Sequence, residues 1–101
     1  MSAEAASPFR DLAPEPRYEM AFRDTESRPR LVFADYAVRG DVRVILHVEA
    51  DPALRGSGAA GVFMQALADH ARENGLKLSP VCGYAVAWLR RHPELTALVA
   101  P

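Results

Sequence analysis

The sequence predicts an α+β domain with the element order β-β-β-α-β-α, in which helices pack on a mixed, mostly antiparallel sheet. Residues 31 to 49 hold two strand-like segments separated by a Gly-Asp turn. Apolar residues then recur with helical spacing from Gly58 to Asn74-Gly75, a dipeptide typical of a helix end. The strand-helix-strand succession from residue 42 to residue 78 predicts a parallel pair with a right-handed crossover, added to an antiparallel meander.

Three strands precede the first helix. We expect them at Tyr18–Arg23, Leu31–Val38 and Val42–Glu49, where β-branched and aromatic residues are frequent. In the third strand the even positions form a wholly apolar face, and the odd positions form the other face. The odd positions are Arg43, Ile45, His47 and Glu49.

Two helices and a short strand complete the predicted domain. The first helix has an apolar stripe of Val62, Phe63, Ala66, Leu67, His70 and Ala71. A short strand follows at Leu76–Leu78 and stops at Pro80. The second helix begins at Cys82 or Gly83 and ends at Arg91, with Ala85, Trp88 and Leu89 turned inward, and a short helical turn at Glu94–Val99 closes the chain.

Length and composition set the expected organisation. A chain of 101 residues allows one domain, and its 50% hydrophobic and 25% charged residues are typical of a folded protein. Residues 1 to 16 are rich in Ala, Ser, Pro and Glu and have no apolar period. We therefore predict a disordered tail at residues 1–16 and a domain at residues 17–101.

Charge and cysteine content restrict the partners. A formal net charge of -1 argues against a nucleic-acid partner, because phosphate binding needs a basic excess. The single Cys82 permits no internal disulfide, and three histidines 23 and 22 residues apart lack metal-ligand spacing, so no metal is predicted. With no apolar run of signal-peptide or membrane-spanning length, we expect a cytoplasmic monomer or weak dimer with no membrane partner.

The segment Arg55–Ala60 (RGSGAA) lies between the clearest strand and the clearest helix. Glycines there let a backbone approach a ligand closely, and the first N–H groups of a helix are unpaired donors at its positive end. Such a turn can hold a pyrophosphate. The alternative is a turn that needs small residues only for tight packing.

The same segment resembles a known family. Its R-x-x-G-x-A pattern on Arg55, Gly58 and Ala60 is similar to the Q/R-x-x-G-x-G/A signature of the GNAT superfamily of N-acetyltransferases. The stretches LHVEADPALRGSGAAG, ARENGLKLSPVCGY and RHPEL resemble the minimal, single-domain members of that superfamily. The chain departs from their pattern at Val48 in place of Thr, at Ala50-Asp51 in place of Val-Pro, and at Gly83 where Pro is common.

The resemblance implies a GNAT fold and an acetyl-CoA-dependent transfer of acetyl to a primary amine on a protein, a peptide or a small molecule. The pantetheine arm would lie between the strand ending near Glu49 and the strand Leu76–Leu78. A backbone N–H at a bulge near Val48–Ala50 would support the acetyl carbonyl oxygen. The implied acetyl-CoA-binding residues are Val48, Glu49, Ala50, Arg55, Gly56, Ser57, Gly58, Ala59, Ala60 and Cys82.

Four residues are candidates for the chemistry. His47 and Glu49 share a strand face about 6 to 7 Å apart, and either could take a proton from an ammonium group. Each could equally be a solvated sheet residue. Cys82 opens a helix, where a thiol pKa is lowered, and it could accept the acetyl group or simply line the cleft. Tyr84 is a candidate proton donor to the departing thiolate, or a core aromatic.

Two other functions stay open. A non-catalytic acyl-CoA-binding or sensing module would keep the glycine turn without needing a base. A small interaction domain that has only kept the fold would not bind coenzyme A. Acetylation of an amine would distinguish the enzyme from the non-catalytic binding module. Binding of coenzyme A would distinguish it from the interaction domain.

Overall fold

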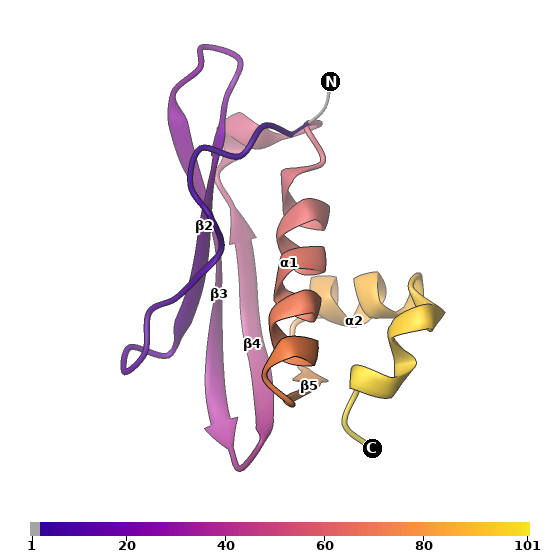
Figure 1. Ribbon diagram of the computed structural model, residues 1–101. Helices are drawn as coiled ribbons and strands as arrows, with labels where there is room; N and C mark the ends of the chain where they lie inside the picture. The colour runs from indigo at the N-terminus through magenta and orange to yellow at the C-terminus, as the bar shows by residue number, and fades with distance from the viewer. Residues whose placement is uncertain (1–2) are drawn as a thin grey trace.

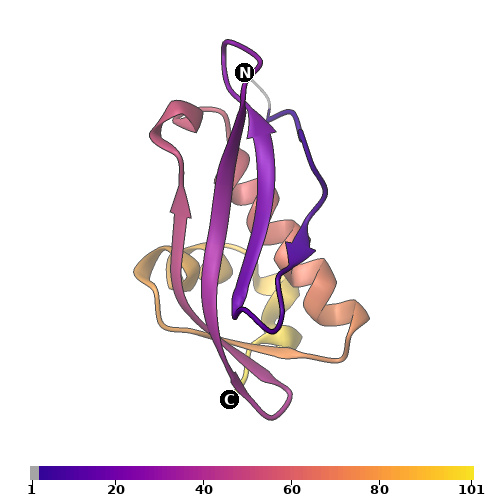
Figure 2. The same cartoon turned by 90° about the vertical axis from the view of Figure 1, so that its left-hand side faces the viewer.

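A five-stranded sheet with the strand order β1-β2-β3-β4-β5 organises the computed structural model, which describes residues 3–101. The first four strands are antiparallel and β5 runs parallel to β4, as predicted. Both helices lie on one side of the sheet, and the other face of β2, β3 and β4 carries no helix (Figures 1 and 2). The strands are β1 (Arg10–Asp11), β2 (Arg17–Arg23), β3 (Pro29–Arg39), β4 (Val42–Ala50) and β5 (Lys77–Pro80).

Two α-helices, α1 (Ala59–Glu73) and α2 (Gly83–Arg90), and two 3₁₀ segments, η1 (Pro52–Leu54) and η2 (Pro93–Leu98), follow the strands. The α1 helix links β4 to β5, which is the predicted crossover. It ends where Asn74-Gly75 predicts. There the Leu76 N–H donates to the Ala71 carbonyl at 2.8 Å and the Gly75 N–H donates to the Arg72 carbonyl at 3.4 Å. These two bonds form a Schellman cap, which satisfies the last helical carbonyls.

The hydrophobic core lies between the sheet and α1. Its largest fully buried side chains are Tyr18, Phe22, Phe63, Ile45, Met64, Leu67, Leu78 and Val32. The predicted stripe on α1 is partly wrong, because Met64 and Ala68 are buried whereas Val62 is 45% exposed. The buried arc is rotated because α2 and η2 also pack against α1, so α1 is covered on two sides and not only by the sheet.

A β-bulge interrupts the alternation of side chains along β4. Asp35 of β3 lies opposite His47, but the next residue, Tyr36, lies opposite Ile45, so Leu46 is the extra residue. A bulge of one residue shifts the alternation of the strand. Ile45 is therefore in the core and Leu46 is 47% exposed, so the predicted apolar face of even positions is wrong in the first half of the strand. The resemblance implied a bulge near Val48–Ala50, and the structure has it at Leu46, two residues before that segment.

The N-terminal segment is docked, which corrects the predicted disordered tail for residues 3–16; residues 1–2 lie outside the described residues. Within this segment β1 pairs with β2. The Phe9 ring lies 5.2 Å from that of Tyr18, 5.6 Å from that of Phe63 and 5.3 Å from that of His70. Backbone pairing and one aromatic side chain dock the segment, and neither produces a periodic pattern that a sequence could reveal. The described part of this segment therefore packs against the sheet and α1.

Replacing Phe9 by alanine should lower the free energy of unfolding by about 2 kcal/mol, because a partly buried aromatic side chain leaves a gap between the sheet and α1. Urea unfolding measures the change. Arg10→Ala is the control, since its exposed ion pair with Glu19 should contribute less than about 1 kcal/mol. Equal stability of Phe9→Ala and the wild type would contradict the docking of this segment.

Candidate active site

The turn from Arg55 to Ala60 connects η1 to α1. Gly58 is the N-cap of α1 with φ +82°, a left-handed conformation that favours glycine. A Cβ built on Gly58 would meet nothing within 4 Å, so the backbone here faces open space. Within residues 3–101, the N–H groups of Gly58, Ala60 and Gly61 have no hydrogen-bond acceptor. The turn therefore presents several free donors at the positive end of α1.

Ser57 stabilises the turn itself. Its hydroxyl donates to the Leu54 carbonyl at 2.6 Å and accepts from the Ala59 N–H at 3.2 Å. The Ala59 side chain is buried in the core. Of the predicted binding residues in this turn, Ser57 and Ala59 thus hold the backbone in place, and their neighbours carry the free donors.

A pocket of about 320 Å³ opens over the turn. Ala50 from the end of β4 and Tyr84 from α2 line it together with the turn. Arg55 is also part of its lining and makes no ion pair within the described part of the chain. Free amide donors and an unpaired guanidinium suit a diphosphate, so the residues present fit the phosphate portion of coenzyme A.

The strands β4 and β5 separate beside this pocket. Their pairing ends at Ile45 and Pro80. The N–H groups of Val81 and Cys82 then both donate to the Ile45 carbonyl, at 2.9 Å and 3.2 Å. Beyond Ile45 the chain after β5 turns into α2, which leaves one edge of β4 without a strand partner among residues 3–101.

Backbone donors of β4 point into this gap. The Asp51 N–H bonds to the Leu31 carbonyl of β3 at 3.0 Å. Because N–H directions alternate along a strand, the N–H groups of Val48 and Ala50 point away from β3. Cys82 lies across the gap, close enough for the Val48 N–H to lower the pKa of its thiol.

Cys82 is the N-cap of α2 and is partly buried. Burial raises the pKa of its thiol, but hydrogen bonds from the N–H groups of Ala85, Val48 and Tyr84 lower it, and the net pKa is below the usual value. The predicted position at a helix start is confirmed. The thiol faces the end of β4.

His47 and Glu49 share one face of β4, as predicted. The His47 Nε2 lies 3.0 Å from the Glu49 Oε1, and both side chains are more than half exposed. Phe33 of β3 lies beside them, with its ring centroid 6.1 Å from that of His47. This pair lies on the helix-free face of the sheet, so it does not join Tyr84 and the glycine turn in the pocket.

The sequence analysis missed Asp51, which lines the pocket. Its carboxylate accepts from the Ala53 N–H at 2.8 Å and lies 4.0 Å from the Arg30 guanidinium. An aspartate followed by proline is a recognisable helix-start signal, so Asp51-Pro52 could have revealed the 3₁₀ turn.

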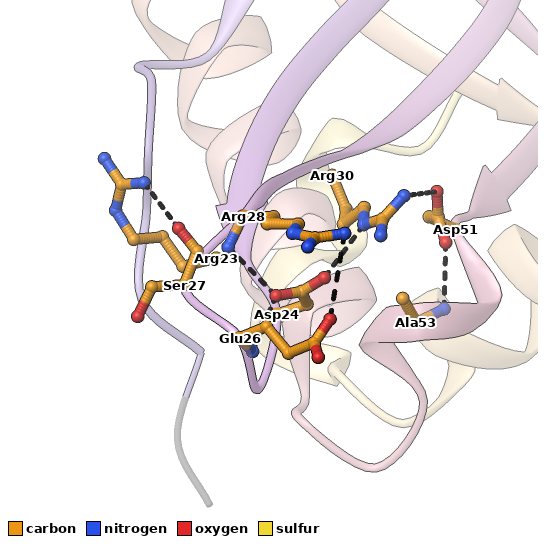
Figure 3. A network of polar contacts seen from close by, with 8 residues as sticks. All are labelled: Arg23, Asp24, Glu26, Ser27, Arg28, Arg30, Asp51 and Ala53. Carbon is orange, nitrogen blue, oxygen red and sulfur yellow. Dashed lines mark hydrogen bonds and ion pairs between the residues drawn. The ribbon is translucent and has the colours of Figure 1, made fainter.

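Arg30 ties the pocket to a second network in the β2–β3 turn (Figure 3). The Asp24 carboxylate is 4% exposed and accepts from the Arg28 N–H at 2.9 Å, the Arg30 Nε at 2.9 Å and the Glu26 N–H at 2.8 Å. These hydrogen bonds, that of Arg28 first, lower the pKa of Asp24 to about 2. Arg30 thus links Asp24 in the β2–β3 turn to Asp51, which lies just before the glycine turn.

Other kinds of site are not evident in residues 3–101. No cluster of three or more His, Cys, Asp or Glu side chains there could hold a metal ion. None of the helices in this part of the chain is long and apolar enough to cross a membrane.

Comparison with known proteins agrees with this geometry. The fold is similar to the NMR solution structure of a GCN5-like candidate N-acetyltransferase from Staphylococcus aureus, with a TM-score of 0.64 and 24% identity over 85% of this chain and 82% of that one. A family model described as GCN5-related N-acetyl-transferase matches residues 17–98. The chain therefore belongs to the GCN5-related N-acetyltransferase family, and the predicted GNAT fold is confirmed. Among curated protein sequences, none is similar enough to count as a match.

The stability of the protein should fall in acid because of Asp24. Its folded pKa of about 2 lies below the value of about 3.9 for an unfolded aspartate, so it stabilises the fold above about pH 4 and loses this effect as the pH falls towards 2. Asp24→Asn should lower the free energy of unfolding at pH 7 and reduce its pH dependence between pH 4 and pH 2.

Urea unfolding at several pH values measures this effect. Asp41→Asn is the control, because the Asp41 side chain makes no hydrogen bond or ion pair with the rest of residues 3–101. If the free energy of unfolding fell equally steeply between pH 4 and pH 2 in Asp24→Asn and the wild type, the stabilising role of the Asp24 carboxylate would be contradicted.

Proposed function

We propose that this protein transfers the acetyl group of acetyl-CoA to a primary amine. The observation that carries the proposal is the set of free N–H groups on Gly58, Ala60 and Gly61, which face a pocket beside the gap between β4 and β5. Family membership supports the reaction class.

The glycine turn would hold the diphosphate of acetyl-CoA. Its free amides and the positive end of α1 favour an anion, and Arg55 adds a full positive charge. The Ala50 N–H would donate to a carbonyl of the pantetheine arm, as it would to a neighbouring strand in a continued sheet. Acetyl-CoA itself supplies the acetyl group as an activated thioester.

Proton transfer would fall to the exposed pair on β4. The acceptor amine would approach from the helix-free face of the sheet, where His47 takes a proton from its nitrogen and Glu49 orients the imidazole at 3.0 Å. The nitrogen would then form a bond to the acetyl carbon and release its second proton to solvent, while the carbon–sulfur bond breaks. The Val48 N–H would stabilise negative charge on the carbonyl oxygen.

Tyr84 would return a proton to the departing thiolate. Burial raises the pKa of Tyr84 although Arg91 lowers it in part, so the phenol is protonated at neutral pH and can donate. Cys82 lines the gap next to Val48 and need not carry the acetyl group, because the amine can attack the thioester directly.

Gly58→Ala should abolish the stabilisation by acetyl-CoA, because a methyl group would occupy the space over the turn that the diphosphate needs. In the wild type, acetyl-CoA at 100 times its dissociation constant should stabilise the fold by about 2.7 kcal/mol. Thermal unfolding with and without acetyl-CoA measures this, and release of free thiol in the presence of an amine panel measures transfer.

Gly40→Ala is the matched control. Gly40 also has a positive φ and an unobstructed Cβ position, but it lies in the β3–β4 turn and not in the pocket. It should lose similar stability while keeping the acetyl-CoA shift. Absence of any shift in the folded wild type would refute the proposal, and a shift without thiol release from any amine would favour a non-catalytic acyl-CoA-binding module.

A further inference from the structure

Arg91 follows α2 directly and belongs to a defined face of that helix. It is the C-cap residue with helical dihedral angles, so it continues the helical pattern. At 3.6 residues per turn, positions 84, 88 and 91 fall within an arc of about 60°. Arg91 lies about 10 Å along the axis from Tyr84.

The same face of α2 borders the pocket over the glycine turn. Tyr84 lines that pocket, as does Gly61 of α1. The indole Nε1 of Trp88 lies 3.6 Å from the position that a Cβ would take on Gly61. Arg91 acts on the same region, since burial raises the pKa of the Tyr84 phenol and the charge of Arg91 lowers it in part.

The indole Nε1–H of Trp88 is a hydrogen-bond donor beside Gly61. The Trp88 side chain is only 5% exposed, and no residue from 3 to 101 accepts a hydrogen bond from its Nε1–H, an atom that is not fully removed from solvent. The ring is held by His92, which stacks on it at 3.8 Å and donates from Nδ1 to the Trp88 carbonyl at 2.7 Å. The Nε1–H is therefore available to donate to a ligand that reaches the pocket wall at Gly61.

The arginines of the protein differ in whether they make ion pairs. On the sheet, Arg10, Arg17, Arg23 and Arg30 pair with carboxylates, whereas Arg39 and Arg43 beside the β3–β4 turn make no ion pair within residues 3–101. Arg55, Arg90 and Arg91 make no ion pair with any residue from 3 to 101. Arg90 lines a different, mostly apolar pocket with Val86 and Leu89. Of the unpaired arginines, Arg55 lines the pocket over the glycine turn and Arg91 acts on Tyr84, which lines the same pocket.

We propose that Arg91 and the Trp88 Nε1–H form a second phosphate subsite, which binds the 3′-phosphate on the ribose of coenzyme A. The inference rests on the proposed function, in which the diphosphate occupies the turn. A phosphate monoester offers the two oxygens that a guanidinium binds as a fork, and the indole N–H can donate to a third. The subsite makes the cofactor site selective for coenzyme A over its 3′-dephospho form.

Calorimetric titration of the wild type, Arg91→Gln and Arg90→Gln with coenzyme A and with 3′-dephospho-coenzyme A tests the subsite. The wild type and Arg90→Gln should bind coenzyme A about tenfold more tightly than the dephospho form, since a charge-assisted pair contributes that much. Arg91→Gln should bind the two ligands equally, with its affinity for the dephospho form unchanged. Arg91→Lys should retain part of the selectivity.

Two outcomes would overturn the subsite while leaving the proposed function intact. One is a wild type that binds both ligands equally, and the other is an Arg91→Gln variant that loses affinity for both in the same proportion. A folded wild type that binds neither ligand would instead refute the acetyl-CoA proposal, and the subsite with it.

Discussion

The carbonyl of Ile45 accepts two N–H groups, those of Val81 and Cys82, and the rest of the site depends on this point. The two bonds end the parallel ladder and turn the chain from β5 into α2. A sheet that continued would have used the donors of Val48 and Ala50 for pairing. Because it stops, those donors face a gap, and the bulge at Leu46 turns His47 and Glu49 to the open face of the sheet.

The candidate site is consequently built largely from backbone groups. Free amides come from the turn before α1 and from the end of β4, and side chains such as Ser57 and Asp51 hold those segments in place. This division explains how a domain of 101 residues with a small core can present a cofactor site. Backbone donors are fixed by the fold itself, so few side chains need a dedicated role.

The sequence predicted most elements because their signals are local. Asn74-Gly75 marks the end of α1, and β-branched residues mark β3 and β4. The bulge escaped prediction, since an extra residue at Leu46 is defined only by pairing with β3. Docking of Phe9 escaped for the same reason, because it depends on Phe63 and His70, far away along the chain. The glycine turn was predictable, whereas its link to Asp24 through Arg30 required the folded arrangement.

The central claim is that free backbone donors on the turn and on β4 bind acetyl-CoA together. Amide chemical shifts of the ¹⁵N-labelled protein during titration with acetyl-CoA test it most directly. The account predicts that the amides of Gly58, Ala60 and Gly61 shift along with those of Val48 and Ala50, while amides of the β2–β3 turn stay in place. Shifts confined to residues outside these two segments, or none at millimolar acetyl-CoA, would contradict it.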